Sequence, residues 1–124
     1  MKIGTDIVEI GRVKTAVDRT GQPFLERVFT PFEIEYCRGK TRFKYESLAA
    51  RFAAKEAFSK AMGTGIGENA HLTEIEVRNL ESGKPVLILS GETLEYFNKT
   101  FSGMSVDVSL SHTAKLAVAT VIIG

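Results

Sequence analysis

The chain has 124 residues, 44% of them hydrophobic and 25% charged, with a formal net charge of +1. This length and composition predict one folded domain, residues 1–124, and the near-neutral charge argues against nucleic-acid binding, which usually needs a basic face. Asp6 and Glu9 interrupt the only N-terminal apolar stretch and no later run reaches membrane-spanning length, so we expect a cytoplasmic protein that makes no membrane contact.

The first forty residues predict one strand followed by short helices. Residues 2–10 read as a strand, and a helical stretch opens at Gly11. The Thr-Gly-Gln-Pro segment at 20–23 ends that stretch, and a turn or short helix follows it. Thr30 and Glu33 then have the spacing of a capping box with a proline at the first helical position, so another helix should begin at this proline.

Residues 45–62 predict the longest helix of the chain, which is amphipathic. Its small and apolar residues recur at the helical period along one arc: Ala53, Ala54, Ala57, Phe58, Ala61 and Met62. Its polar residues lie on the opposite arc, within reach of a single ligand: Lys55, Glu56, Ser59 and Lys60, with Arg51 at the border. A charged helix face is more often only a solvated surface, where an exposed Glu56–Lys60 pair would contribute about 0.3–0.5 kcal/mol.

Three glycines at alternate positions, 63, 65 and 67, follow this helix. Glycine lets the backbone approach a ligand closely, so this segment is a candidate ligand-binding loop. Its spacing matches neither the dinucleotide-binding fingerprint nor the P-loop, and Gly63 could equally serve only as a helix cap. Residues 38–60 also carry a basic excess, which suggests a phosphorylated or acidic partner.

The C-terminal half predicts two β-hairpins with a short helix between them, around residues 92–98. The paired strands are residues 74–78 with 86–89, and residues 104–111 with 116–123. His112 lies at the bend of the second hairpin, where its imidazole could reach a phosphate or a proton in transit, although an isolated turn histidine is more often structural. Because helices and strands do not alternate regularly, we predict an α+β fold with a mainly antiparallel sheet packed against the long amphipathic helix.

Asp6 is an acidic residue inside a short apolar strand. Such a position is unfavourable unless the carboxylate faces solvent, a cation or a partner, and simple alternation onto a wet face would explain it equally well. If Asp6 and Glu56 converge, they offer two oxygen ligands of the kind that Mg²⁺ takes, with water and substrate phosphate completing its octahedron.

Three segments together resemble one family: GTDIVEIGR at 4–12, RFAAKEAFSKAMGTGIG at 51–67 and SLSHT at 109–113. They are similar, in the same order, to the bacterial holo-acyl-carrier-protein synthases, the small branch of the 4'-phosphopantetheinyl transferase superfamily. The resemblance implies the fold of that superfamily. It also implies a transferase that moves the 4'-phosphopantetheine of coenzyme A onto a serine of an apo acyl carrier protein, releasing adenosine 3',5'-bisphosphate, in fatty acid and lipid biosynthesis.

The same resemblance implies roles for individual residues. Asp6 and Glu56 would bind Mg²⁺ and act in catalysis with Lys60 and His112, and Glu56 is one candidate for the general base. Contacts to coenzyme A would come from Arg51, Lys55, Lys60, Gly63, Gly65, Gly83, Lys84, Pro85, His112 and Thr113.

The family pattern further implies that the acidic carrier docks on a basic first helix. The residues here would be Arg12, Arg19 and Arg27, with Phe24 as an apolar contact. Asp18 and residues 21–23 make this surface less basic and less regular than the family pattern. The resemblance also implies a homotrimer with active sites at subunit interfaces. From the residues alone, a non-catalytic module that binds coenzyme A or a carrier and a metal-dependent hydrolase stay open as alternatives.

Overall fold

A computed structural model describes all residues, 1–124, and the predicted elements appear in it in the predicted order. The helices and strands are β1 (Lys2–Glu9), α1 (Ile10–Thr20), α2 (Gln22–Val28), α3 (Pro31–Cys37), α4 (Tyr45–Met62), a 3₁₀ turn (Leu72–Glu74), β2 (Ile75–Asn79), β3 (Pro85–Leu89), α5 (Gly91–Thr100), β4 (Val106–His112) and β5 (Leu116–Ile123). The α+β class is therefore confirmed. None of the helices combines the length and the apolar character needed to cross a membrane.

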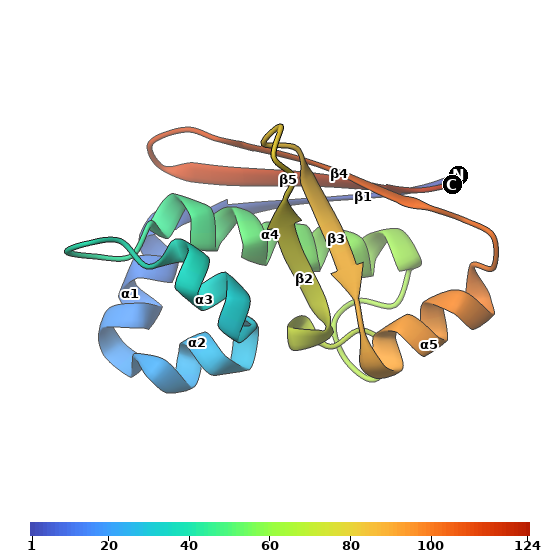
Figure 1. Cartoon of the computed structure of the whole chain (residues 1–124), viewed down its shortest axis with the longest axis horizontal. Helices are drawn as coiled ribbons and strands as arrows, with labels where there is room; N and C mark the ends of the chain where they lie inside the picture. Colours follow the sequence, from blue (N-terminus) through green and yellow to red (C-terminus); the bar gives the residue numbers. More distant parts are fainter.

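The strands form two antiparallel sheets, both built from the predicted hairpins. The larger sheet has the order β1-β5-β4, and β2 pairs with β3 in the smaller one. In Figure 1, α4 runs beneath the larger sheet, α1 to α3 gather at one end and α5 lies at the other, while the β2–β3 hairpin crosses α4. The pairing places Asp6 opposite Ala119, and it aligns Val8, Ala117 and His112 across the three strands.

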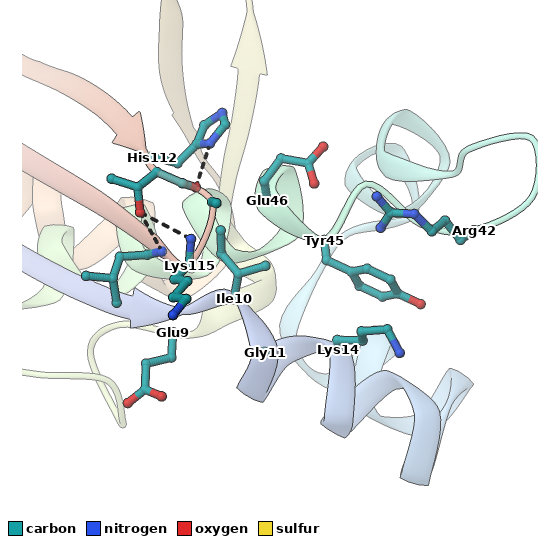
Figure 2. Close-up of a pocket in the computed structure, with 12 residues that line it drawn as sticks. Glu9, Ile10, Gly11, Lys14, Arg42, Tyr45, Glu46, His112 and Lys115 are labelled. Carbon is teal, nitrogen blue, oxygen red and sulfur yellow. Dashed lines mark hydrogen bonds between the residues drawn. The ribbon is translucent and has the colours of Figure 1, made fainter.

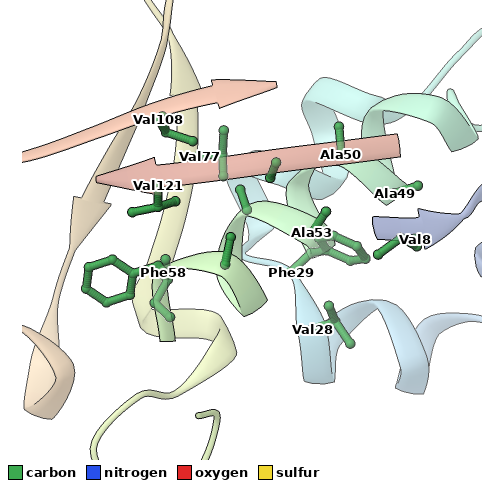
Figure 3. Close-up of a cluster of buried hydrophobic side chains, with 14 of the residues drawn as sticks. Val8, Val28, Phe29, Ala49, Ala50, Ala53, Phe58, Val77, Val108 and Val121 are labelled. Carbon is green, nitrogen blue, oxygen red and sulfur yellow. The ribbon is translucent and has the colours of Figure 1, made fainter. Parts of the chain in front are cut away.

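Helix α4 is the centre of the core, and it is buried around most of its circumference. Alanines along its length allow β1, β5 and α3 to pack closely against it, as Figure 3 shows for Ala49, Ala50 and Ala53. The prediction of an exposed polar arc is wrong for three of its members, because Arg51, Lys55 and Ser59 are 3%, 0% and 0% exposed. The cause is tertiary: α3 and β2 pack against this helix as well.

Gly4 brings β1 against α4 more closely than any side chain would allow. A Cβ atom at this position would lie 2.1 Å from the backbone oxygen of Ala57 and 2.6 Å from the backbone nitrogen of Ala61. Asp6 lies two residues further along the same face of the strand, because side chains alternate between the faces. The close approach at Gly4 therefore sets the distance between Asp6 and the helix.

Two local predictions are confirmed in detail. Thr30 and Glu33 form a reciprocal capping box at the start of α3, with the Glu33 carboxylate accepting from the Thr30 N–H at 2.9 Å. Gly63 caps the C-terminus of α4 in the left-handed region, at φ +86°, and its N–H reaches the carbonyls of Ser59 and Lys60. Glycine tolerates this conformation without strain.

Candidate functional site

Asp6 and Glu56 line one pocket of about 480 Å³, and Lys60 lies beside them. The Lys60 ammonium donates to Asp6 Oδ1 at 2.8 Å and to the Thr5 carbonyl at 3.2 Å. The Asp6 side chain is 17% exposed, so it does not face bulk solvent as simple alternation would have it. Lys60 pairs with Asp6 and not with Glu56, so the Glu56–Lys60 pair expected of a merely solvated helix face does not form.

The Asp6 and Glu56 carboxylates lie near one ammonium group, that of Lys60, which is paired with Asp6. Burial raises the pKa of Glu56, the nearby charge of Asp6 raises it further, and Lys60 opposes both effects. Negative charge is thus held at a partly buried place where another cation would be favourable. No group of three or more His, Cys, Asp or Glu side chains is arranged to hold a metal ion. Two hard oxygen donors fit magnesium, which commonly takes one or two carboxylates together with water and phosphate.

Lys55, the residue next to Glu56, lies in a different environment. Its ammonium donates to Glu33 Oε1 at 2.6 Å and to the Leu72 carbonyl at 2.8 Å, and the Lys55 and Glu33 side chains are both fully buried. Burial lowers the pKa of Lys55, and the Glu33 charge partly offsets this. Lys55 does not line the Asp6 pocket, so its expected contact with coenzyme A stays a prediction without support from this geometry.

Arg51 is also buried, and its guanidinium has no carboxylate partner. It donates to Ser47 Oγ at 2.7 Å and to Asn79 Oδ1 at 2.8 Å, and it stacks over the Tyr36 ring at 4.3 Å. Its Nε has no hydrogen-bond partner. Neutral oxygens and an aromatic face stabilise this cation without neutralising it, so Arg51 adds positive charge to the inner flank of α4.

His112 and Thr113 line a second, larger pocket of about 850 Å³, at the start of α4. Figure 2 shows His112 there with Lys14, Arg42 and Lys115, which give the pocket positive charge, and with Glu46. The imidazole Nδ1 lies 3.2 Å from the Thr113 carbonyl oxygen. Glu9 lines both pockets. Within one chain, the structure therefore does not bring His112 and Asp6 into the same pocket.

The two glycine-containing segments lie away from both pockets. Gly63 and Gly65 follow α4, both with positive φ, Gly83 and Lys84 lie in the β2–β3 turn, and Pro85 begins β3. In that turn the Lys84 ammonium donates to Asp107 on β4 at 2.8 Å. Neither segment lines the Asp6 pocket or the His112 pocket, so their expected contacts with coenzyme A stay predictions.

The expected docking residues lie on α1 and α2, and two of them border the Asp6 pocket. Arg12 and Phe24 line it, and the Arg12 side chain is 82% exposed, with Nε 3.7 Å from a Glu9 carboxylate oxygen. Arg19 and Arg27 are exposed in the last turns of their helices. Arg12 and Phe24 are thus beside the carboxylate pair, while Arg19 and Arg27 do not line this pocket.

Sequence reasoning missed two residues that build the site and one that pairs with the buried Lys55. Phe52 lines the Asp6 pocket, and its place in the RFAAKEA segment was the available signal. Gly4 sets the approach of β1 to α4, and a glycine inside a strand does indicate close backbone contact. Glu33 was recognised only as a capping residue, and no sequence signal pairs it with Lys55.

Comparisons with known proteins agree with this fold. The profile of the 4'-phosphopantetheinyl transferase superfamily matches residues 2–120. A holo-[acyl-carrier-protein] synthase of Ruminiclostridium cellulolyticum is 50% identical over 123 residues, which cover 99% of this chain and 91% of the relative. The crystal structure of the Helicobacter pylori synthase in complex with coenzyme A is 38% identical with a TM-score of 0.84, covering 98% of this chain and 99% of that one. The Bacillus anthracis synthase, in complex with CoA (3',5'-ADP), is 39% identical with a TM-score of 0.78, covering 98% and 94%.

Proposed function

Because the chain belongs to the 4'-phosphopantetheinyl transferase superfamily, as a holo-[acyl-carrier-protein] synthase, we propose that it carries out phosphopantetheine transfer with a magnesium ion held by Asp6 and Glu56. The donor is coenzyme A, the acceptor is a serine of an apo acyl carrier protein, and the second product is adenosine 3',5'-bisphosphate. The observation that carries this proposal is the shared pocket of Asp6, Glu56 and Lys60, which opens beside the docking candidates Arg12 and Phe24.

The residues of the pocket have separate tasks in this reaction. The serine oxygen forms a bond to the phosphorus attached to pantetheine, and the bond from that phosphorus to the adenosine bisphosphate oxygen breaks. Lys60 neutralises negative charge on the departing phosphate, which is the main catalytic requirement in phosphoryl transfer. Glu56, which lines the pocket beside Asp6, is the candidate that takes the serine proton. A bound magnesium ion would supply further charge neutralisation at the pyrophosphate.

The carrier protein docks on α1 and α2 in this account. Arg12, Arg19 and Arg27 supply positive charge for an acidic partner, and Phe24 supplies an apolar contact at the edge of the pocket. Lys14 contributes less because it pairs with Asp18 on the same helix at 2.9 Å. The docked serine would thereby reach Asp6 and Glu56 along the groove that Phe24 and Phe52 border.

The proposal includes assembly into a homotrimer through the outer face of the larger sheet. Ile3 and Ile7 are 67% and 63% exposed there, and Leu116 and Ile122 lie opposite Glu9 and Ile3 on the neighbouring strand. Contiguous apolar surface of this kind typically marks an interaction site. A second copy packed on this face could also supply His112 to the Asp6 pocket, which one chain alone does not. We place this assembly in the cytoplasm, in lipid biosynthesis.

The experiment is a mass measurement of the carrier. The purified protein is incubated with coenzyme A, Mg²⁺ and an apo acyl carrier protein, and the carrier is weighed by mass spectrometry. We expect a mass gain of one phosphopantetheine that requires both Mg²⁺ and coenzyme A. If the masses of several different acyl carrier proteins all stay unchanged, the proposal is contradicted. Release of free phosphopantetheine or phosphate would then indicate a hydrolase, and its absence a binding module.

A further inference from the structure

We propose that Lys60 competes with the metal ion for the Asp6 carboxylate, so that metal binding is strong only when the donor's pyrophosphate draws Lys60 away. This inference rests on the function proposed above and adds a coupling between the binding of the two ligands. Coenzyme A and the metal would bind cooperatively, and a side chain of this chain would be the cause.

The first support is that Lys60 and the proposed metal ion would use the same carboxylate, that of Asp6. Asp6 Oδ1 already accepts a hydrogen bond from the Lys60 ammonium at 2.8 Å, and the side chain of Asp6 is mostly buried. A magnesium ion ligated by this carboxylate would lie about 2.0–2.1 Å from the oxygen. An ammonium group and a divalent cation that crowd one carboxylate repel each other, so each weakens the binding of the other.

The second support is the way the backbone fixes Lys60 beside Asp6. A Cβ atom at Gly4 would lie 3.1 Å from the Cβ of Lys60, so this lysine emerges from α4 directly against β1. Its ammonium also donates to the Thr5 carbonyl at 3.2 Å. The contact with Asp6 is therefore part of the packing of β1 on α4 and not a chance encounter of two long surface side chains.

The third support is that Lys60 is free to leave. Its side chain is 52% exposed, and Asp6 is its only carboxylate partner. Lysine carries its charge on a flexible stem with three rotatable donors, which can turn toward a phosphate as readily as toward a carboxylate. Lys55 shows the opposite condition, because its ammonium is fully buried and cannot exchange partners.

The consequence is a coupling between two ligands. When the pyrophosphate binds Lys60, the repulsion at Asp6 is relieved and the metal binds more tightly. By thermodynamic linkage, the metal raises the affinity for coenzyme A by the same factor. A static Lys60 that only balanced the charge of Asp6 would give no such contribution.

The test measures Mn²⁺ binding to the full-length protein by the electron paramagnetic resonance signal of free Mn²⁺, with and without coenzyme A. The variants are Lys60→Met, Lys60→Arg and, as a charge-matched control, Lys99→Met, because Lys99 is exposed in the last turn of α5. Without coenzyme A, we expect Lys60→Met to bind Mn²⁺ about fivefold more tightly than wild type, which corresponds to about 1 kcal/mol for a half-exposed ion pair. Lys60→Arg and Lys99→Met should bind like wild type.

Coenzyme A should strengthen Mn²⁺ binding by a larger factor in the wild type than in Lys60→Met, although the variant transfers more slowly. Equal, weaker or undetectable Mn²⁺ binding in Lys60→Met without coenzyme A overturns the competition, as does equal tightening in Lys60→Arg. Asp6→Asn reports whether the measured ion is at this site, and unchanged Mn²⁺ binding in that variant overturns the proposal too. Wild-type transfer in the carrier mass assay is a separate result, so failure of the competition is distinguishable from failure of the enzymatic function.

Discussion

Helix α4 carries two lysines with opposite surroundings, five residues apart. Lys55 is sealed inside the molecule against Glu33, with both side chains fully buried and the Glu33 carboxylate also bonded to two backbone N–H groups. Lys60 is half exposed and lines a pocket together with the Asp6 and Glu56 carboxylates. The Glu33–Lys55 pair is complete, whereas the Asp6–Glu56–Lys60 group carries more negative charge than its lysine neutralises.

The difference separates a structural ion pair from a candidate reactive one. A buried pair that is fully hydrogen-bonded has nothing left to offer a ligand, and breaking it leaves an uncompensated charge. A group whose charges are unbalanced and reachable from a pocket can accept another cation or anion. The residue type is the same, so the distinction lies in the partners and in the access.

The largest effect is expected from substitutions in the Asp6–Glu56–Lys60 group. Asp6→Asn or Glu56→Gln should lower kcat for carrier modification by about a thousandfold or more, because each removes an oxygen donor and a negative charge from the proposed metal site. Glu56→Gln should not lose thermal stability, since it relieves the repulsion between the two carboxylates. Asp6→Asn should lose about 1 kcal/mol or less, because it gives up the half-exposed ion pair with Lys60. Glu95→Gln, on the exposed face of α5, is the matched control. Wild-type turnover in either site variant would remove these residues from the mechanism.

The next largest effect is expected from substitutions in the buried Glu33–Lys55 pair. Lys55→Met or Glu33→Gln alone should cost about 3–5 kcal/mol of unfolding free energy in urea denaturation, because each leaves a buried polar group without its partner. The double variant should recover most of this loss. Equal destabilisation by the single and double variants would contradict the account. If the stable double variant also has a raised KM for coenzyme A, Lys55 contacts the donor after all.

A smaller effect acts on the packing that joins β1 to α4. Gly4→Ala should cost about 1–3 kcal/mol of stability, because its methyl group would overlap the Ala57 carbonyl oxygen. It should also lower kcat, since moving β1 separates Asp6 from Glu56. Gly11→Ala is the matched control, because no atom lies within 4 Å of a Cβ there, and the change favours helix. If the two variants behave alike, the close approach at Gly4 does not position the site.

The smallest effect is a dependence of stability on pH. Because the pKa of Glu56 is raised in the folded chain above its ordinary value of 4.5, the folded state binds more protons than the unfolded state between these two values. The stability contributed by protonated Glu56 is therefore present below pH 4.5 and is lost as the pH rises through the raised pKa. Thermal unfolding in EDTA should show this slope in wild type and not in Glu56→Gln. An identical slope in both would contradict the raised pKa.

The sequence predicted most of the fold because the signals that start and end its helices and strands are local. The capping box at Thr30, the glycine after Met62 and the alternation in the two hairpins each fix an element without reference to the rest of the chain. The pattern of the family segments likewise led to Asp6 and Glu56, which the structure places in one pocket.

What the sequence could not predict depends on tertiary contacts. Lys55 and Lys60 lie on the same predicted polar arc, and only the packing of α3 and β2 against α4 buries one of them. The location of His112 in a separate pocket follows from its place across the sheet from Val8, which no local pattern encodes. The exposed apolar face of the sheet could not be predicted either. Its residues alternate with the core residues of the same strands, so the sequence does not show which apolar residues stay exposed.

The most direct test of the metal site is a crystal of the protein grown with coenzyme A and Mn²⁺, with anomalous diffraction recorded to locate the ion. We predict one strong peak within coordination distance, about 2.0–2.3 Å, of a carboxylate oxygen from both Asp6 and Glu56 and of a pyrophosphate oxygen. A manganese peak held by other residues, with the pyrophosphate of coenzyme A bound away from these carboxylates, would contradict the account.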